Sequence, residues 1–228
     1  PTVYGKFGKD MALLVGDALL FKGLTLLNKT SEQGIPVEKM AVIVDIIMNM
    51  FFELGDAEAM ELPLRKRADI SPDEYLQVVR KKAADVEANT KISAILGDGS
   101  KEEIRALGEY GRLLGMLIIL RDDWIDLTNF EEARNRIKRE CLPLPLLYAL
   151  QDPRTKAVIK SILEKDKITG KDAETILEVI YESGGEDRFR KLLRELQREA
   201  SEKLRNVKPQ ARVLELLLEA TMPPFREA

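Results

Sequence analysis

Helical periodicity runs through almost the whole sequence, and this feature limits the possible folds more than any other. Stretches rich in Leu, Ala, Glu, Lys and Met alternate with short breaks, and no strand-like alternation bounded by hairpin signals occurs. Ser71-Pro72 and the pair Ser100 and Glu103 have the residue types of helix N-termini. The sequence predicts an all-α protein with helices near residues 8–28, 37–62, 72–96, 101–128, 143–151, 154–165, 171–183, 187–207 and 210–221.

The composition excludes several kinds of chemistry. The 228 residues include no histidine and one cysteine. A Ser-His-Asp triad, an imidazole base, an HExxH zinc site and an intrachain disulfide are therefore impossible within this sequence. Catalysis would have to use carboxylates, lysines, arginines or tyrosines, and a bound metal would be a hard cation such as Mg²⁺. The length predicts a single domain over residues 1–228.

The charge and hydropathy patterns narrow the possible partners and location. A net charge of −3 gives no electrostatic reason to expect nucleic-acid binding. The longest apolar stretches are interrupted or too short for a transmembrane segment, and no secretory signal is visible. We therefore expect a cytoplasmic protein without a transmembrane segment.

The helix predicted at 101–128 contains the most informative residues. Its segment LLGMLIIL (113–120) is apolar all round, which indicates burial, and Asp122, Asp123 and Asp126 follow at once. Asp122 and Asp126 share one helix face. Carboxylates grouped beside a buried helix are costly unless a cation neutralises them. Two interpretations remain open: acids on a solvated helix end, or a clamp for a divalent metal.

The helix predicted at 37–62 has a polar stripe on an otherwise apolar sequence. Asp45, Asn49, Glu53 and Asp56 follow one another at steps of four, four and three residues, so they lie along one face. Such a stripe indicates a satisfied core group, an exposed edge or the wall of a partly polar cavity in a helical bundle.

Several segments, in order along the whole chain, resemble the trans-polyprenyl diphosphate synthase family, the head-to-tail isoprenoid synthases. PTVYGKFGKDMALLVGDALLF resembles the family stretch PTxxxxxGxxxAxLxGDxLL, and EAMEL resembles QAxDL. YLQVVRKKAADV resembles YxxxxxxKT, and YGRLLGMLIILRDDWIDL resembles GxxxGxxFQxxDDxxD, the second aspartate-rich motif. LPLPLLYAL resembles TLPLIYAL, and PPFREA resembles the last turn of the family.

The resemblance implies a bundle of antiparallel helices around a central cavity, of which this chain would be the larger C-terminal part without the N-terminal helices. It implies Mg²⁺-dependent condensation of isopentenyl diphosphate with an allylic diphosphate, by a homodimer or by a heteromer with a paralogue. The implied metal ligands are Asp122, Asp123 and Asp126, and Lys82, Asp122 and Asp123 are the implied catalytic residues. Lys82, Glu58, Lys138 and Arg139 are the implied substrate-binding residues.

Solvated surface positions remain an open alternative for Lys82 and for the basic run that contains Lys138 and Arg139. The chain also departs from the family pattern. Ala83 replaces a Thr, Ile118-Ile119 replace Phe-Gln, and Glu140-Cys141 replace Gly-Lys. The first DDxxD motif is expected upstream of Pro1. Three alternatives to an active synthase therefore stay open: a diverged low-activity or regulatory subunit, a terpene synthase on the same fold, and a purely structural helical bundle.

Overall fold

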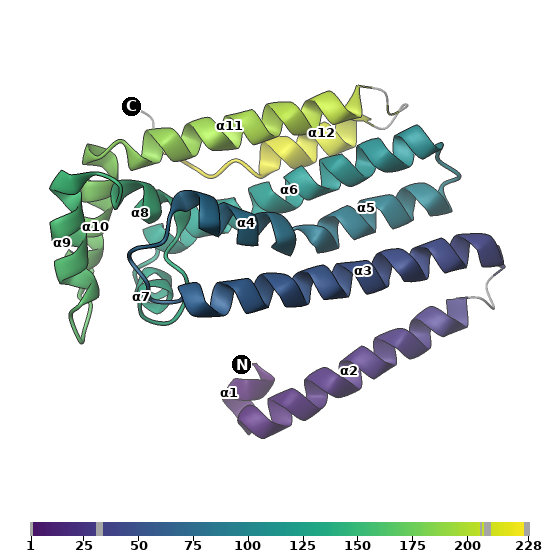
Figure 1. Ribbon diagram of the computed structural model, residues 1–228, viewed down its shortest axis with the longest axis horizontal. Helices are drawn as coiled ribbons and strands as arrows, with labels where there is room; N and C mark the ends of the chain where they lie inside the picture. Colours follow the sequence, from purple (N-terminus) through teal and green to yellow (C-terminus); the bar gives the residue numbers. More distant parts are fainter. Residues whose placement is uncertain (1, 31–33, 206, 208–210, 226–228) are drawn as a thin grey trace. The chain divides into compact units, whose positions relative to one another are not determined.

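The structure, a computed structural model, describes residues 2–30, 34–205, 207 and 211–225. These residues form helices and no strand, which confirms the all-α prediction (Figure 1). The α-helices are α1 Val3–Phe7, α2 Lys9–Lys29, α3 Val37–Glu61, α4 Pro72–Lys82, α5 Ala84–Leu96, α6 Lys101–Thr128, α7 Phe130–Arg139, α8 Leu144–Ala149, α9 Pro153–Leu163, α10 Gly170–Glu182, α11 Gly185–Leu204 and α12 Ala211–Ala220. Pro1, residue 210 and the last three residues of PPFREA lie outside the described residues.

Internal packing divides the chain into two units, residues 1–45 and 46–228, and α3 contributes to both. In the first unit the Thr2 hydroxyl accepts a hydrogen bond from the Gly5 N–H at 3.0 Å and caps α1. Gly8, at φ 85°, then separates α1 from α2, because glycine adopts positive φ without a steric penalty. The predicted helix at 8–28 is confirmed as α2, whereas the sequence did not indicate α1.

Helix α6 is central to the second unit and packs against α5 and α11 (Figure 1). The contact with α5 is close: a Cβ on Gly111 would lie 2.8 Å from the Val86 carbonyl oxygen, and one on Gly115 would lie 2.8 Å from the Ala83 Cβ. Only glycine fits at these two positions without moving the backbone of α5. The predicted burial of segment 113–120 is confirmed except at Ile118, which is 38% exposed, and at Ile119, which is partly buried.

An aromatic cluster closes the core beside the last turns of α6. Trp124 is buried and stacks against Phe189 of α11, with ring centroids 6.1 Å apart. Phe225 lies 5.0 Å from Trp124 between centroids, so the segment after α12 also joins this core. Burial of large aromatic side chains is a strong stabilising contribution in a helical protein.

The helix predicted at 72–96 is two helices. Its start is confirmed: Ser71 and Glu74 form a capping box at the beginning of α4. The helix then breaks at Ala83 (φ −71°, ψ 4°), and α5 begins at Ala84. Neither Gly nor Pro marks this break in the sequence. It coincides instead with tertiary contacts, because Ala83 packs on Gly115 and Arg112 donates a hydrogen bond to the Arg80 carbonyl.

Helix α7 was not predicted, because the sequence analysis considered its basic residues only as a charged run. Its start does carry a local signal: the Asn129 side chain accepts hydrogen bonds from the N–H groups of Glu131 (3.1 Å) and Glu132 (3.4 Å). Acidic residues fill the first turn and basic residues the last, in agreement with the helix dipole. Within the described residues no helix has the length and hydropathy needed to cross a bilayer.

Candidate functional site

The three aspartates at the C-terminal end of α6 lie in three different environments. Asp122 is exposed, Asp123 is completely buried, and the side chain of Asp126 is 28% exposed. Successive residues of an α-helix point about 100° apart, so adjacent aspartates face different surroundings. The three residues therefore cannot be treated as one set of equivalent carboxylates.

Asp123 is held by protein donors on both carboxylate oxygens. Its Oδ1 accepts a hydrogen bond from the Tyr75 hydroxyl at 2.8 Å and pairs with the Arg136 guanidinium. Its Oδ2 accepts the Leu144 N–H at 3.1 Å. Burial raises the pKa of Asp123 to about 6, although Arg136 and the Leu144 amide act in the opposite direction. Asp123 thereby connects α4, α6, α7 and the start of α8.

Arg136 is the cation of this buried cluster, and the sequence analysis considered it only as a member of the basic run that contains Lys138 and Arg139. Its side chain is only 17% exposed and pairs with Asp123, with Asp126 at 3.6 Å and with Glu140 at 3.2 Å. Burial would lower the pKa of Arg136, but Asp123 and the other acids raise it overall. Arg136 is therefore not part of a solvated face. An Asp123 side chain acting as a metal ligand would have to exchange these protein partners for the metal.

Asp122 and Asp126 offer the chemistry that a divalent cation needs. Burial raises the pKa of Asp126, and the charges of Glu132, Asp122 and Glu140 raise it further, while Arg136 lowers it. Three acidic residues and one arginine thus act on Asp126. Hard carboxylate oxygens in such a field fit Mg²⁺, which usually keeps water or phosphate oxygens as its remaining ligands. In the part of the chain that the structure describes, no three acidic or cysteine side chains are grouped as a complete metal site.

Lys82 forms a second charged cluster at the C-terminal end of α4. Its Nζ lies 2.6 Å from Oε2 of Glu61 and 3.1 Å from Oε1 of Glu58, both at the end of α3. Arg65 lies 3.7 Å from each of these glutamates. Burial lowers the pKa of Lys82, but the two glutamates raise it overall, so Lys82 remains a cation at neutral pH. Its side chain is 27% exposed and therefore reachable from solvent.

Cys141 lies between the two clusters. Its Sγ is 3.7 Å from the Glu61 carbonyl oxygen, and burial raises its pKa to about 12. Glu61 raises the Cys141 pKa further, whereas Lys82 and Arg136 lower it. Glu61 also pairs with Lys82, and Glu140, which directly precedes Cys141, pairs with Arg136, so Cys141 links the two clusters. An inert buried thiol fits a packing role for Cys141.

Lys138 and Arg139 are not brought into these clusters. Lys138 Nζ donates to the carbonyl oxygens of Leu163, the last residue of α9, and of Lys165, and Arg139 is exposed. Their assignment to substrate binding stays a prediction, as do the roles of Lys82, Glu58, Asp122, Asp123 and Asp126.

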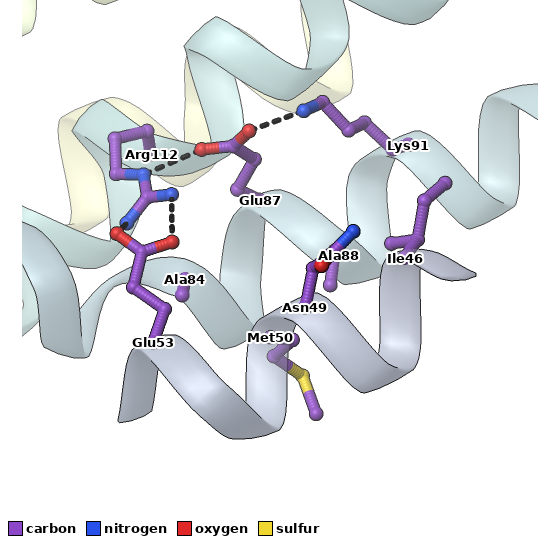
Figure 2. Close-up of a pocket in the computed structure, with 9 residues that line it drawn as sticks. All are labelled: Ile46, Asn49, Met50, Glu53, Ala84, Glu87, Ala88, Lys91 and Arg112. Atoms are coloured by element: carbon purple, nitrogen blue, oxygen red, sulfur yellow. Dashed lines mark hydrogen bonds and ion pairs between the residues drawn. The ribbon is translucent and has the colours of Figure 1, made fainter. Parts of the chain in front are cut away.

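The polar stripe predicted on α3 is only partly confirmed. Asn49 and Glu53 line a cavity of about 110 Å³ between α3, α5 and α6 (Figure 2). Asp56 instead pairs with Lys81 at 2.7 Å, and Asp45 is exposed. Figure 2 also shows Arg112, which the sequence analysis missed, between Glu53 and Glu87. Its YGR context gave no sign that the side chain is largely buried.

Comparison with known proteins shows to which family this chain is related. The sequence profile described as polyprenyl synthetase matches residues 1–180. A geranylgeranyl diphosphate synthase of Methanosarcina mazei is 30% identical over 210 residues, which cover 90% of this chain and 63% of that protein. The chain spans between 40% and 63% of the length of the first curated relatives that it matches.

Solved structures agree with this assignment. The crystal structure of geranylgeranyl pyrophosphate synthetase from Pyrococcus horikoshii Ot3 matches with a TM-score of 0.84 at 27% identity, over 97% of this chain and 69% of that one. A geranylgeranyl pyrophosphate synthase from Corynebacterium glutamicum, complexed with isoprenyl diphosphate and magnesium, has the same fold. Its TM-score is 0.79 at 23% identity, over 95% of this chain and 64% of that one. The chain therefore belongs to the polyprenyl synthetase family.

Proposed function

We propose that this protein is a Mg²⁺-dependent prenyltransferase that joins isopentenyl diphosphate to an allylic diphosphate and forms a short-chain trans-isoprenyl diphosphate. The observation that carries the proposal is that α4 links two groups of opposite charge. Lys82 is a reachable cation at the end of this helix, and Tyr75 of the same helix donates a hydrogen bond to Asp123, which lies on α6 between Asp122 and Asp126. The family assignment supports this choice of substrate class.

Each residue has a definite task in this reaction. Asp122 and Asp126 would hold Mg²⁺, which when bound supplies positive charge to the diphosphate oxygens. Lys82 binds the same diphosphate and stabilises the negative charge that develops as the allylic C–O bond breaks. The new C–C bond forms to isopentenyl diphosphate, and the released pyrophosphate accepts the proton that is lost. The raised pKa of Lys82 fits a charge-stabilising role and not that of a base.

The test is an elongation assay with purified protein, isopentenyl diphosphate, dimethylallyl diphosphate and Mg²⁺. We expect chain elongation, its loss on adding EDTA, and a rate about 100-fold lower for Asp122→Ala, because one electrostatic contact to the transition state is lost. Asp166→Ala, which removes an exposed carboxylate between α9 and α10, is the matched control and should retain the rate. Elongation that survives Asp122→Ala would contradict the metal role. Cyclic products from the allylic diphosphate alone would favour a terpene synthase.

A second candidate, a diverged subunit with low activity of its own, has one specific observation in its favour. Lys82 is already paired with both Glu58 and Glu61, so a diphosphate must compete with two carboxylates for this cation. No elongation by the purified protein, restored by co-expression with an active paralogue, would support this alternative. Activity of the protein alone would exclude it.

We also propose that the protein assembles as a homodimer. Large apolar side chains of α2, including Leu13, Leu19 and Phe21, are exposed. Exposed apolar side chains in such number on one helix are typical of an interaction surface. Sedimentation analysis should give twice the monomer mass, and Phe21→Glu should shift it to the monomer. A wild-type monomer would contradict the proposal.

A further inference from the structure

A single arginine joins the helices that bear the candidate site. Arg112 on α6 lies between Glu53 of α3 and Glu87 of α5 (Figure 2). Its Nη1 and Nη2 donate to the two carboxylate oxygens of Glu53 at 2.8 and 2.9 Å, and its Nε donates to Glu87. The planar guanidinium suits this two-pronged contact, which a lysine cannot reproduce.

The fourth contact of Arg112 is to the backbone of α4. Its Nη1 also donates to the Arg80 carbonyl oxygen at 2.7 Å. The last four carbonyls of an α-helix have no partner within the helix, and α4 ends at Lys82. Arg112 therefore caps the C-terminal end of α4 directly before the break at Ala83. The cap lies two residues from Lys82, and the break fixes where the Lys82 side chain leaves the helix.

The surroundings of Arg112 show that these contacts are not a loose surface arrangement. The Arg112 side chain is 14% exposed, and Glu87 pairs in turn with Lys91. Burial lowers the pKa of Arg112, but Glu53 and Glu87 raise it overall, so the charge is retained. Removing one partner of a largely buried ion pair leaves the other charge uncompensated. The four helices are thus fixed to one another through one side chain.

We infer that Arg112 is a positioning residue for the candidate diphosphate site, because it fixes the end of α4 that bears Lys82 relative to α3, which bears Glu58 and Glu61, and to α6, which bears Asp122. The inference rests on the proposed function for its effect on catalysis. Arg112 lies ten residues before Asp122 on α6, which corresponds to about 15 Å along the helix, so it does not touch the reacting groups itself. Displacement of Lys82 by about 1 Å is enough to weaken its contact with a diphosphate.

The test compares Arg112→Met and Arg112→Lys with Lys165→Met in the purified full-length protein. Lys165→Met breaks the ion pair between Lys165, which follows α9, and Asp172 of α10, and neither residue lines the pockets that contain Arg112. We expect KM for the allylic diphosphate to rise about tenfold in Arg112→Met and less in Arg112→Lys, and to stay unchanged in Lys165→Met. A merely structural role would lower the active fraction, and thus kcat, without raising KM.

A second measurement does not depend on activity. Amide hydrogen exchange at residues 80–86 should become about tenfold faster in Arg112→Met, because the cap on α4 is lost, and should not change in Lys165→Met. Unchanged exchange at residues 80–86 in Arg112→Met would overturn the inference. If the wild type is active, an unchanged KM in Arg112→Met would also overturn it. A wild-type protein without elongation activity would count against the proposed function, while the exchange experiment would still decide the inference.

Discussion

Asp122 and Asp123 are neighbours in the sequence, yet they belong to two different regions of the molecule. Asp123 points into the core, where three protein donors satisfy its oxygens. Asp122 is exposed, and its charge is one of those that raise the pKa of the nearby Asp126. A carboxylate whose partners are all internal stabilises the fold, whereas a carboxylate beside like charges is available to a cation. One DDxxD motif thus contains an internally bonded carboxylate and an exposed one.

The largest expected effect comes from removing the inner carboxylate. Asp123→Ala should lower the free energy of unfolding by about 3–5 kcal/mol, because it leaves the buried Arg136 without its main partner. Asp122→Ala, the matched control, should change it by less than about 0.5 kcal/mol. Urea denaturation measures both values. Equal losses for the two variants would remove the distinction between the two regions.

A double variant sharpens the same contrast. Asp123→Leu combined with Arg136→Met replaces the buried pair by apolar side chains, so neither charge is left unpaired. We expect the double variant to be at least about 1 kcal/mol more stable than the sum of the single losses indicates. A double-mutant cycle by urea denaturation gives this coupling energy. If the losses of the two single variants simply add up, the ion pair itself contributes no coupling energy, and Asp123 stabilises the fold only through its hydrogen bonds from Tyr75 and Leu144.

The Lys82 cluster should behave like the outer carboxylates. Lys82→Met is expected to cost about 1 kcal/mol of stability or less, because the ion pairs of Lys82 are partly exposed. The same change should weaken pyrophosphate binding, measured by calorimetry with Mg²⁺, by about tenfold or more. Lys81→Met breaks a comparable ion pair with Asp56 and is the control that should retain affinity. Equal losses of pyrophosphate affinity in Lys82→Met and Lys81→Met would mean that the effect comes from the loss of one positive charge and not from a specific contact of Lys82.

The smallest effect concerns Asp172, a buried carboxylate in the first turn of α10. Hydrogen bonds from Lys165 and Thr169 lower its pKa, in contrast to the raised pKa of Asp126. A lowered folded-state pKa gives stability that is present above the unfolded pKa of about 4 and is lost as the pH falls towards the folded value. The melting temperature of Asp172→Asn should therefore lie below that of the wild type at pH 6, and the difference should shrink progressively as the pH falls below about 4. A difference in melting temperature that does not change with pH would contradict a lowered pKa for Asp172.

The sequence predicts the helical class and most helix positions because burial repeats with the helical period over long stretches. It did not predict the break at Ala83, since the causes are contacts with Gly115 and the hydrogen bond from Arg112, both about 30 residues away in the sequence. The missed α7 is different: the signal at Asn129 was local and readable.

In the candidate site, too, some features follow from local sequence patterns and others depend on contacts between distant residues. The residue types and the grouping of Lys82 with Glu58 follow from the motifs, and the structure pairs them. The separation of Asp123 from Asp122 does not follow, because the sequence spacing cannot tell which side of α6 meets Tyr75 and Leu144. Similarly, Arg136 and Lys138 are alike in the sequence, but only Arg136 reaches the aspartates.

The glycine contacts between α5 and α6 also determine where the chain tolerates changes in length. Gly111 and Gly115 fit against Val86 and Ala83 in only one register. Inserting or deleting one residue within either helix would rotate everything beyond it by about 100° and break this register. The turn at 97–100 between the two helices can absorb such a change without altering that register. Among relatives of this protein, differences in length between these helices are therefore expected only at this turn.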